Sequence, residues 1–325
     1  MYNTLADLVR EAQETGASLP AIVLANEAAL SDVPKAEIIA GMRARWQVMQ
    51  RSAHTALNAP QHMTPPLIMG QAQTQEHYAQ SGRTLCGAAF NHMLAMAFSA
   101  SEVNAAMGRI CAAPTAGACG ILPAVVATAA ETLGSSDDDV RGALLTAAGV
   151  GAVITKNATV SGAEGGCQAE CGTAAAMAAA AVVQLAGGSA EAAVHAAAIA
   201  LINCMGLVCD PVAGLVQLPC SFRNASQSAN ALASADMALA GQRSLIPPDE
   251  VVEAMYRVGR SLPGALRETA QGGIAAAPAA RGIEKQLQEM DTGGEEHSPA
   301  AQLGAGEPQT SAAAPGPAAA AEARA

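Results

Sequence analysis

The sequence predicts an all-α domain, and three observations support that prediction. No segment of the 325 residues shows the sustained apolar and polar alternation, rich in β-branched residues, that is typical of strands. Long Ala-rich apolar runs are bounded by Gly and Pro, which is the pattern of buried helices. Aromatic residues make up only 2% of a chain that is 51% hydrophobic, and small side chains let helices pack closely.

The N-terminal part predicts helices separated by a long loop. Residues 4–15 carry apolar side chains at helical spacing, and residues 31–34 form a helix-start signal with Pro set for a first turn. Residues 58–83 are rich in Pro, Gly, Gln and Thr, so they predict a loop, and loops of this length are often functional. Residues 99–102 have the form of a capping box and predict the start of a short helix.

The C-terminal part predicts a series of buried helices. A loop rich in Gly and Pro at residues 113–120 precedes an apolar helix that should reach about residue 133. The further predicted helices are an acidic start at 135–139 leading into 143–154, and then 172–185, 189–205, 224–239 and 247–258. The sequence thus predicts a helical domain at 1–285 and a disordered Ala/Pro-rich tail at 286–325, where large apolar residues are nearly absent.

Charge and cysteine usage exclude several classes of protein. The net charge of -11, without a basic stripe, argues against a nucleic acid or an anionic membrane as partner. The first ten residues do not resemble a signal peptide, and the Ala-rich runs are too short to span a bilayer. We therefore expect a cytoplasmic protein whose eight cysteines are free thiols or metal ligands and not disulfides.

Three loops combine Gly or Pro with Ser, Thr, Asn or Asp: residues 114–120, 157–166 and 209–220. Such loops bring backbone N–H groups close to a ligand. Cys167, Cys209 and Cys220 each lie beside Gly or Pro in or next to these loops. Their spacing is neither that of a zinc ribbon nor that of a ferredoxin, so spacing alone leaves open an iron–sulfur cluster, a zinc site and inert buried cysteines.

The motifs in these loops resemble those of the iron–sulfur-dependent L-serine dehydratases, and most closely the α chain of the two-subunit form. The resemblance covers roughly residues 1–285 and includes Gly-Gly-Cys-Gln at 165–168, Cys-Asp-Pro at 209–211 and Leu-Arg-Glu-Thr at 266–269. It implies a lyase of amino-acid degradation and gluconeogenesis that converts L-serine to pyruvate and ammonia. It also implies a [4Fe–4S] cluster held by Cys167, Cys209 and Cys220, with one iron left open for substrate oxygen.

The resemblance also suggests where substrate and partner bind. The residues expected to contact substrate are Ser81, Gly82, Arg83, Thr115, Gly117, Asn157, Ser161, Gly162, Gln168 and Glu170. For each, a structural role in its loop is an equal alternative. No catalytic base is assigned, because in the family a Ser-Ser-His-Thr motif lies on a β chain. Residues 52–55 read Ser-Ala-His-Thr, but they fall in a predicted N-terminal helix, and we interpret that likeness as coincidence.

The other cysteines and the histidines have plainer interpretations. Cys171 follows Cys167 at helical spacing, yet relatives commonly carry Val there, so a packed thiol is expected. Cys119 takes the place of small residues that are common in relatives, and the cysteines Cys86, Cys111 and Cys204 are expected in or near the core. His195 is expected to be a packed or surface residue.

Three other functions compete with this interpretation. A sibling lyase similar to cysteine desulfidase would share the cysteine pattern. A pyridoxal-phosphate dehydratase would need a Schiff-base lysine, for which Lys156 is the candidate beside the Asn157 loop. A non-enzymatic helical scaffold or zinc-binding module would leave the polar Gly-rich loops without a purpose.

Overall fold

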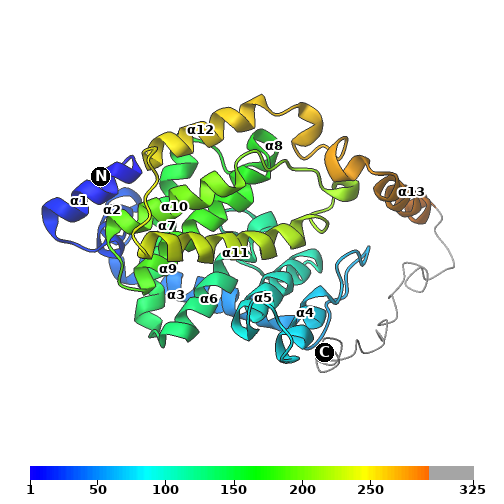
Figure 1. Ribbon diagram of the computed structural model, residues 1–325, viewed down its shortest axis with the longest axis horizontal. Coiled ribbons are helices and arrows are strands. Elements are labelled where there is room, and N and C mark those ends of the chain that lie inside the picture. The colour runs from blue at the N-terminus through cyan, green and yellow to red at the C-terminus, as the bar shows by residue number, and fades with distance from the viewer. Residues whose placement is uncertain (293–325) are drawn as a thin grey trace, which may run out of the picture.

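The computed structural model describes residues 1–292, which fold into a stack of α-helices (Figure 1). No strand forms within these residues, and one isolated parallel bridge pairs Cys209 with Arg267. The predicted all-α class is therefore confirmed. The α-helices are α1 (Leu5–Thr15), α2 (Leu19–Ser31), α3 (Lys35–Thr55), α4 (Gln71–Gln80), α5 (Ala88–Ala105), α6 (Ile121–Leu133), α7 (Asp137–Asn157), α8 (Gly162–Gly165), α9 (Thr173–Leu185), α10 (Ala190–Cys204), α11 (Cys220–Leu239), α12 (Pro248–Ser261) and α13 (Pro278–Thr292).

Helix α9 forms the centre of the core. Every residue from 173 to 183 is buried, and the helix packs against α6, α7, α10 and α11. Small side chains make this arrangement possible, because an Ala-rich helix can be approached closely from several sides. Gly149 of α7 illustrates how tight the packing is, since a Cβ built there would lie 2.4 Å from Val23 Cγ2 of α2. The scarcity of aromatic residues in the sequence thus agrees with a close helix-on-helix interior.

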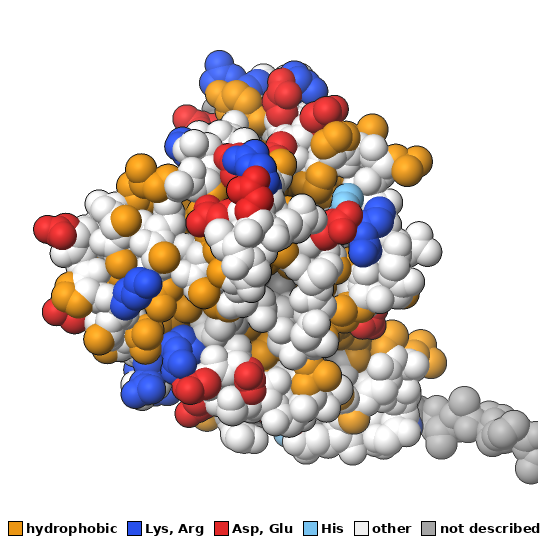
Figure 2. Space-filling model, turned by 90° about the vertical axis from the view of Figure 1, so that its left-hand side faces the viewer, with side chains coloured by type: hydrophobic (Ala, Val, Ile, Leu, Met, Phe, Trp, Pro, Cys, Tyr) orange, Lys and Arg blue, Asp and Glu red, His pale blue; other side chains and the backbone are white. Residues whose placement is uncertain are grey.

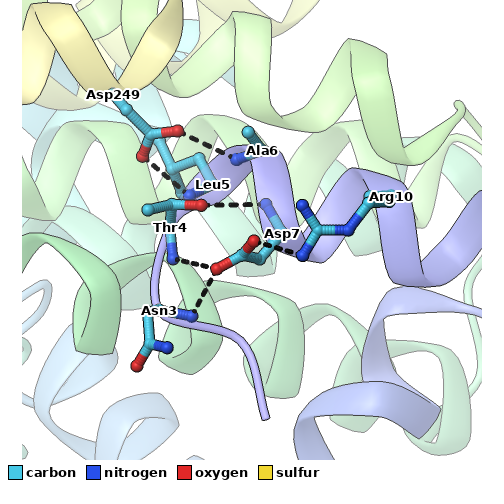
Figure 3. Close-up of polar contacts among 7 residues, drawn as sticks. All are labelled: Asn3, Thr4, Leu5, Ala6, Asp7, Arg10 and Asp249. Carbon is cyan, nitrogen blue, oxygen red and sulfur yellow. Dashed lines mark hydrogen bonds and ion pairs between the residues drawn. The ribbon is translucent and has the colours of Figure 1, made fainter.

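The N-terminal helix α1 is tied to the start of α12 (Figure 3). The carboxylate of Asp249 accepts hydrogen bonds from the backbone N–H groups of Leu5, at 2.7 Å, and Ala6, at 2.9 Å. Thr4 and Asp7 form a capping box in which each side chain accepts a hydrogen bond from the other residue's backbone N–H. These bonds satisfy N–H groups that no helical carbonyl can reach, and they join segments far apart in the chain.

The prediction of one long loop at residues 58–83 is wrong, because helix α4 occupies Gln71–Gln80. The polar sequence of α4 carries little helical periodicity of its own. Its position is set instead by Glu102, a buried carboxylate that accepts hydrogen bonds from Ala72 N at 2.8 Å and Gln61 N at 3.2 Å. A side chain from another helix therefore determines where α4 begins, which sequence periodicity does not show.

The predicted helix start at residues 99–102 is also wrong, since these residues lie in the interior and last turn of α5. The hydroxyl of Ser99 donates to Ser52 O at 2.7 Å and accepts from Ala56 N at 2.9 Å. The polar side chains of the apparent capping box therefore join α5 to the end of α3 and to the loop before α4, and they cap nothing.

The other predicted helices are confirmed, with shifted ends. Helix α2 was not predicted, α11 begins at Cys220 instead of residue 224, and α13 continues to Thr292, past the predicted domain boundary at 285. The remainder of the predicted tail lies outside the described residues. The window Ala116–Leu133 is long and apolar enough to cross a membrane, but 72% of it is buried within the fold, as in a core helix.

Charged side chains of both signs are interspersed on the face shown in Figure 2, which is the left-hand side of Figure 1. Asp and Glu outnumber Lys and Arg in the sequence, 28 against 17. On this face, acidic and basic groups alternate and do not gather into one continuous field.

Candidate functional site around three cysteines

Three separate segments carry the predicted ligand cysteines. Cys167 precedes a π-helical turn, Gln168–Gly172, that leads into α9. Cys209 lies on the bridge to Arg267, and Cys220 is the first residue of α11. Cys167 and Cys209 are 2% and 3% exposed, whereas Cys220 is half-buried, and none of the three forms a disulfide. Short π-helical turns often occur at functional sites because they redirect side chains out of the regular helical pattern.

Gln168 holds the turn that follows the first cysteine. It is fully buried, its Nε2 donates to Gly165 O and Met255 O at 2.9 Å each, and its Oε1 accepts from Gly206 N at 2.8 Å. The amide therefore joins the Cys167 turn to α12 and to the segment that leads to Cys209. These bonds occupy the amide and agree with the structural alternative for Gln168, whose role as a substrate contact stays a prediction.

A buried ion pair holds the segment around the second cysteine. Arg223 of α11 donates from Nη1 to Val208 O at 2.7 Å and from Nη2 to Asp210 Oδ1 at 2.6 Å. The other carboxylate oxygen of Asp210 accepts from Ile274 N at 2.6 Å. Both oxygens of the Asp210 carboxylate are thus engaged in contacts within the fold. The pair fixes the backbone on both sides of Cys209.

Asn224 ties the loop at residues 115–120 to the start of α11. Its Nδ2 donates to Gly117 O at 2.7 Å and to Cys220 O at 2.9 Å, and its Oδ1 accepts from Gly120 N at 2.8 Å. One fully buried amide thereby positions the third cysteine against the loop that carries Thr115. Sequence reasoning did not single out Asn224 or Arg223, because neither lies in the motifs around the cysteines.

Two carboxylates face the same small space as Cys209. Thr115 Oγ1 donates to Glu170 Oε1 at 2.6 Å. A Cβ built on Gly162 would lie 2.8 Å from Glu170 Oε2, 3.0 Å from Cys209 Sγ and 3.3 Å from Glu268 Oε2. The structure therefore brings the predicted residues Thr115, Gly162 and Glu170 together with one of the cysteines. Glu268 was not predicted as a site residue, although the motif at 266–269 contains it.

Gly117 belongs to the same cluster. A Cβ built on it would lie 2.9 Å from Glu170 Oε1 and 3.4 Å from Val216 Cγ1. Gly117 and Gly162 thus flank the Glu170 carboxylate from two loops, and the missing side chains leave the space beside it open. Both were predicted site residues, and their position next to Glu170 is consistent with that prediction.

Burial shifts the ionisation of these groups toward their neutral forms. It raises the pKa of Glu170, and the negative charge of Glu268 raises that pKa further, against the opposing hydrogen bond from Thr115. Burial also raises the pKa of Cys220 to about 12 and that of Cys209 above its ordinary range. A metal ligand must be a thiolate, so a positive centre between these sulfurs would offset the cost of ionising them.

The pKa of Cys167 is shifted in the opposite direction to that of the other two predicted ligands. Its pKa is lowered, first by a hydrogen bond from the Cys171 thiol and then by the charge of Arg223, against the effect of burial. Cys171 itself is buried, as expected for a packed thiol. Among the three cysteines, Cys167 is therefore the one whose pKa is lowered by its neighbours in the protein.

The predicted residues outside this cluster lie at other contacts. Ser81, Gly82 and Arg83 follow α4 and are exposed, and the Ser81 hydroxyl donates to Tyr78 O at 2.7 Å. Asn157 is exposed at the end of α7, and its Nδ2 donates to Asn3 O at 2.7 Å. The structure does not bring these four residues into contact with the cysteine cluster, so a role for them in substrate binding stays a prediction.

Ser161 lies directly before α8 and beside Gly162. Its backbone N–H donates to Thr159 Oγ1 at 3.1 Å. Within residues 1–292 its own hydroxyl has no hydrogen-bond partner, so it is available to a ligand next to Gly162. Its predicted role as a substrate contact is compatible with this position.

The remaining cysteines are not part of the cluster's open space. Cys119 is buried with its Sγ 3.6 Å from Ala100 O, and Cys204 is buried with its Sγ 2.5 Å from the position of a Cβ on Gly172. Cys111 is half-buried. The expectation that Cys86 lies in or near the core is wrong: it is exposed, in the loop between α4 and α5.

His195 and Lys156 lie outside the site. His195 is partly buried on α10, with an Nδ1 that has no partner, which agrees with a packed residue. Lys156 is exposed, and its amine contacts the Asn3 side chain. The described part of the chain also contains no strand from which a phosphate-binding turn could follow. Lys156 therefore lacks the surroundings of a Schiff-base lysine.

No group of three His, Cys, Asp or Glu side chains in residues 1–292 converges closely enough to hold a single metal ion. The three cysteines nevertheless affect one another, because the charge of Cys167 raises the pKa of both Cys209 and Cys220. The thiolate ligands of a cluster bind different irons, so they need not converge on one atom. A shared cluster is compatible with this arrangement.

Comparison with known proteins gives one consistent family. A family model described as the serine dehydratase alpha chain matches residues 14–275. The L-serine dehydratase alpha chain of Peptoniphilus asaccharolyticus is 48% identical, over 88% of this chain and 98% of the relative. A probable L-serine dehydratase alpha chain of Bacillus subtilis is 42% identical, over 88% of this chain and 95% of the relative. L-serine dehydratase 1 of Escherichia coli is 39% identical over 84% of this chain, which covers 61% of that longer protein.

Proposed function

Since this chain belongs to the serine dehydratase alpha chain family, we propose that it deaminates L-serine to pyruvate and ammonia with a [4Fe–4S] cluster held by Cys167, Cys209 and Cys220. One observation carries the assignment of the site. Cys209 and two carboxylates face the space that Gly162 leaves open, and Cys167 and Cys220, from two other segments, lie near enough to raise the pKa of Cys209. The free state of all eight cysteines also supports our proposal of a reducing, cytoplasmic location.

The residues present fit such a cluster. The three cysteines are buried or half-buried, and side chains of Gln168, Arg223 and Asn224 hold backbone carbonyl groups at or near each of them. When bound, a cluster with three protein thiolates supplies one iron with an open position, which acts as a Lewis acid toward a substrate oxygen. Cys171 lies beside Cys167 and is a neighbour of the ligand set, not a member of it.

The two carboxylates are suited to bind the ammonium group of L-serine. Glu170 and Glu268 face the same space beside Gly162, and their negative charges repel each other. A cation between them would relieve this repulsion. Thr115 fixes one oxygen of Glu170 and leaves the other directed to the space beside Gly162. We therefore assign Glu170 and Glu268 to the ammonium and Thr115 to the orientation of Glu170.

We further propose that a β chain completes the active site and supplies the base that removes the Cα proton. The relatives from Peptoniphilus asaccharolyticus and Bacillus subtilis are named alpha chains. The Escherichia coli relative is a single longer protein that this chain covers only in part. In this assignment the described chain holds the cluster and the ammonium, and the partner contributes the proton acceptor.

The test is a turnover assay under anaerobic conditions with reconstituted protein, with and without the β chain. We expect pyruvate from L-serine, formed only with both chains present, and much less hydrogen sulfide from L-cysteine. Faster hydrogen sulfide release than pyruvate formation would replace this function with that of a desulfidase-like lyase. Reduction of pyridoxal phosphate onto Lys156 by borohydride would contradict the cluster mechanism and favour the pyridoxal-phosphate enzyme.

A further inference from the structure

A second cleft lies between the N-terminal helices and the core, and it shares no lining residue with the cysteine site. It has a volume of about 500 Å³, which is within the range of small-molecule sites. Its walls come from α2, α3, α6, α7 and α9 and from the loop at residues 111–114. The buried apolar side chains that line it are Val23, Met49, Leu122, Leu144, Leu145 and Met177.

One face of α3 brings charge to this cleft. Glu37, Gly41, Arg45 and Met49 follow each other at intervals of four and line the cleft together. A Cβ built on Gly41 would lie 2.8 Å from Arg45 Nη1, so the guanidinium lies against the helix where Gly41 has no side chain. Glycine inside a helix costs about 1 kcal/mol relative to alanine. At this position, the glycine leaves the space that the guanidinium of Arg45 needs.

The charges in the cleft are not paired with one another. Arg45 forms no ion pair within residues 1–292, and the same holds for the carboxylates of Glu27 from α2 and Glu37 from α3. All three residues line the cleft and are exposed. The cleft thus combines one free cation, two free anions and a buried apolar surface.

We propose that this cleft binds a free α-amino acid with a large apolar side chain. Its carboxylate would pair with Arg45, its ammonium with Glu37, and its side chain would lie on the apolar wall. The guanidinium lies over Gly41, one helical turn of about 5.4 Å from Glu37. The two charged groups of an α-amino acid are joined to one carbon, so they suit two opposite charges this close together. Neither a simple anion nor a simple amine would use both charges.

The cleft is connected to the cysteine site through one short loop. Residues 111–114 line the cleft, and the next residue is Thr115, whose hydroxyl donates to Glu170. A ligand in the cleft would contact this loop and so affect the position of Thr115. We therefore expect the ligand to change the KM for L-serine. That expectation rests on the function proposed above, whereas the binding itself does not.

Binding is tested by isothermal titration calorimetry on the full chain without iron, so that the result is independent of the cluster. The probes are L-phenylalanine and L-leucine, together with 3-phenylpropionate, which lacks the ammonium, and phenethylamine, which lacks the carboxylate. We expect the amino acids to bind and each truncated probe to bind at least about tenfold more weakly. No binding of either amino acid, or equal binding of phenethylamine, would overturn the proposal.

Substitutions on α3 assign the contacts. Arg45→Gln should weaken the binding of L-phenylalanine at least about tenfold. Arg43→Gln, on the same helix but lining a different cavity, is the matched control and should leave binding unchanged. Gly41→Ala should displace the guanidinium and weaken binding, although alanine favours the helix, so loss of fold cannot account for the result. Wild-type affinity in both Arg45→Gln and Gly41→Ala would contradict the assigned site.

Discussion

The Ala-rich core around α9 and the segments around the cysteines are built on opposite principles. In the core, regular helices satisfy their own backbone groups, and close packing of small side chains provides the contacts. Around the cysteines the backbone is irregular, and buried polar side chains such as Gln168 and Asn224 hold it. The stability of the fold therefore depends mainly on the first region, and the geometry of the site on the second.

Strained backbone conformations are also more frequent around the cysteines than in the Ala-rich core. Of the five non-glycine residues with positive φ in residues 1–292, three lie in the segments that carry or pair with Cys209: Ala213, Glu268 and Ala270. Such conformations cost energy and persist only where surrounding contacts enforce them. Here the Asp210–Arg223 pair and its bond to Ile274 supply these contacts. Substitutions in the two regions should consequently separate activity from stability.

The largest effect is expected at the proposed cluster ligands. Cys209→Ala should lower the rate of pyruvate formation by about three orders of magnitude or more, because a Lewis acid contributes several kcal/mol to the transition state. Cys119→Ala removes an equally buried thiol outside the site and should keep most of the activity. Both variants are assayed anaerobically with the β chain present. Similar activity in the two variants would show that the position of the thiol does not matter.

The second-largest effect is expected at Gly162, which lies in the proposed active site. In Gly162→Ala the new methyl group would lie 2.8 Å from Glu170 Oε2 and 3.0 Å from Cys209 Sγ. We expect the space for the ammonium to close and kcat/KM to fall about a hundredfold, as misplacement of substrate by an ångström can do. The melting temperature should stay nearly unchanged, because one small loop adjusts. Full activity in this variant would show that the space beside Gly162 is not part of the active site.

Gly149→Ala is the matched change in the core. Its methyl group would lie 2.4 Å from Val23 Cγ2, and the overpacking should outweigh the helix preference of alanine. We expect the free energy of unfolding to fall by about 1 kcal/mol, a shift of roughly 2–4 °C in melting temperature. Activity at low temperature should remain. A variant that melts normally but loses activity would contradict the separation between the two regions.

Gln168→Leu should affect both regions, since this residue joins them. The substitution leaves Gly165 O, Met255 O and Gly206 N without their buried partner. We expect a loss of about 1–3 kcal/mol in the free energy of unfolding, together with a lower iron content, because the Cys167 turn is no longer fixed. Chemical denaturation and iron analysis of one preparation measure the two losses. Iron content and stability equal to wild type would mean that the amide is not a structural tie.

The smallest effect concerns the cap of α1. Hydrogen bonds, first from the Asn3 backbone N–H, lower the pKa of Asp7 from 3.8 to about 2. A lowered carboxyl pKa contributes stability above the unfolded value, and this contribution is lost as pH falls from about 3.8 toward 2. Asp7→Asn should therefore melt slightly below wild type at pH 6, with the difference shrinking toward pH 2. An equal difference at both pH values would exclude ionisation as the cause.

The sequence predicts the helices of the core, but it does not predict the polar contacts that hold other segments against that core. Helices α7, α9 and α10 are long apolar runs with breakers at their ends, so their existence follows from composition and periodicity. Helix α4 lacks such a pattern, and the buried Glu102 carboxylate positions its start. The apparent capping box at 99–102 failed for a related reason, because Ser99 bonds to another helix. In both cases a tertiary contact overrides the local signal.

The site could be predicted where a local motif contains the residue. Thr115, Gly162 and Glu170 lie in motifs beside the cysteines, and the structure brings them together. Glu268 and Arg223 join them from distant segments, and only the fold makes that convergence visible. The motif at 266–269 was the available signal for Glu268. The cluster itself followed from family resemblance, because the spacing of the cysteines leaves several metal sites open.

The most direct test of the account is the iron and acid-labile sulfide content of the anaerobically reconstituted chain. A [4Fe–4S] cluster predicts about four irons and about four sulfides per chain, with a broad absorbance near 400 nm. Both contents should vanish together in Cys167→Ala, Cys209→Ala and Cys220→Ala. A single zinc per chain without sulfide, or full iron and sulfide in those three variants, would contradict the assignment.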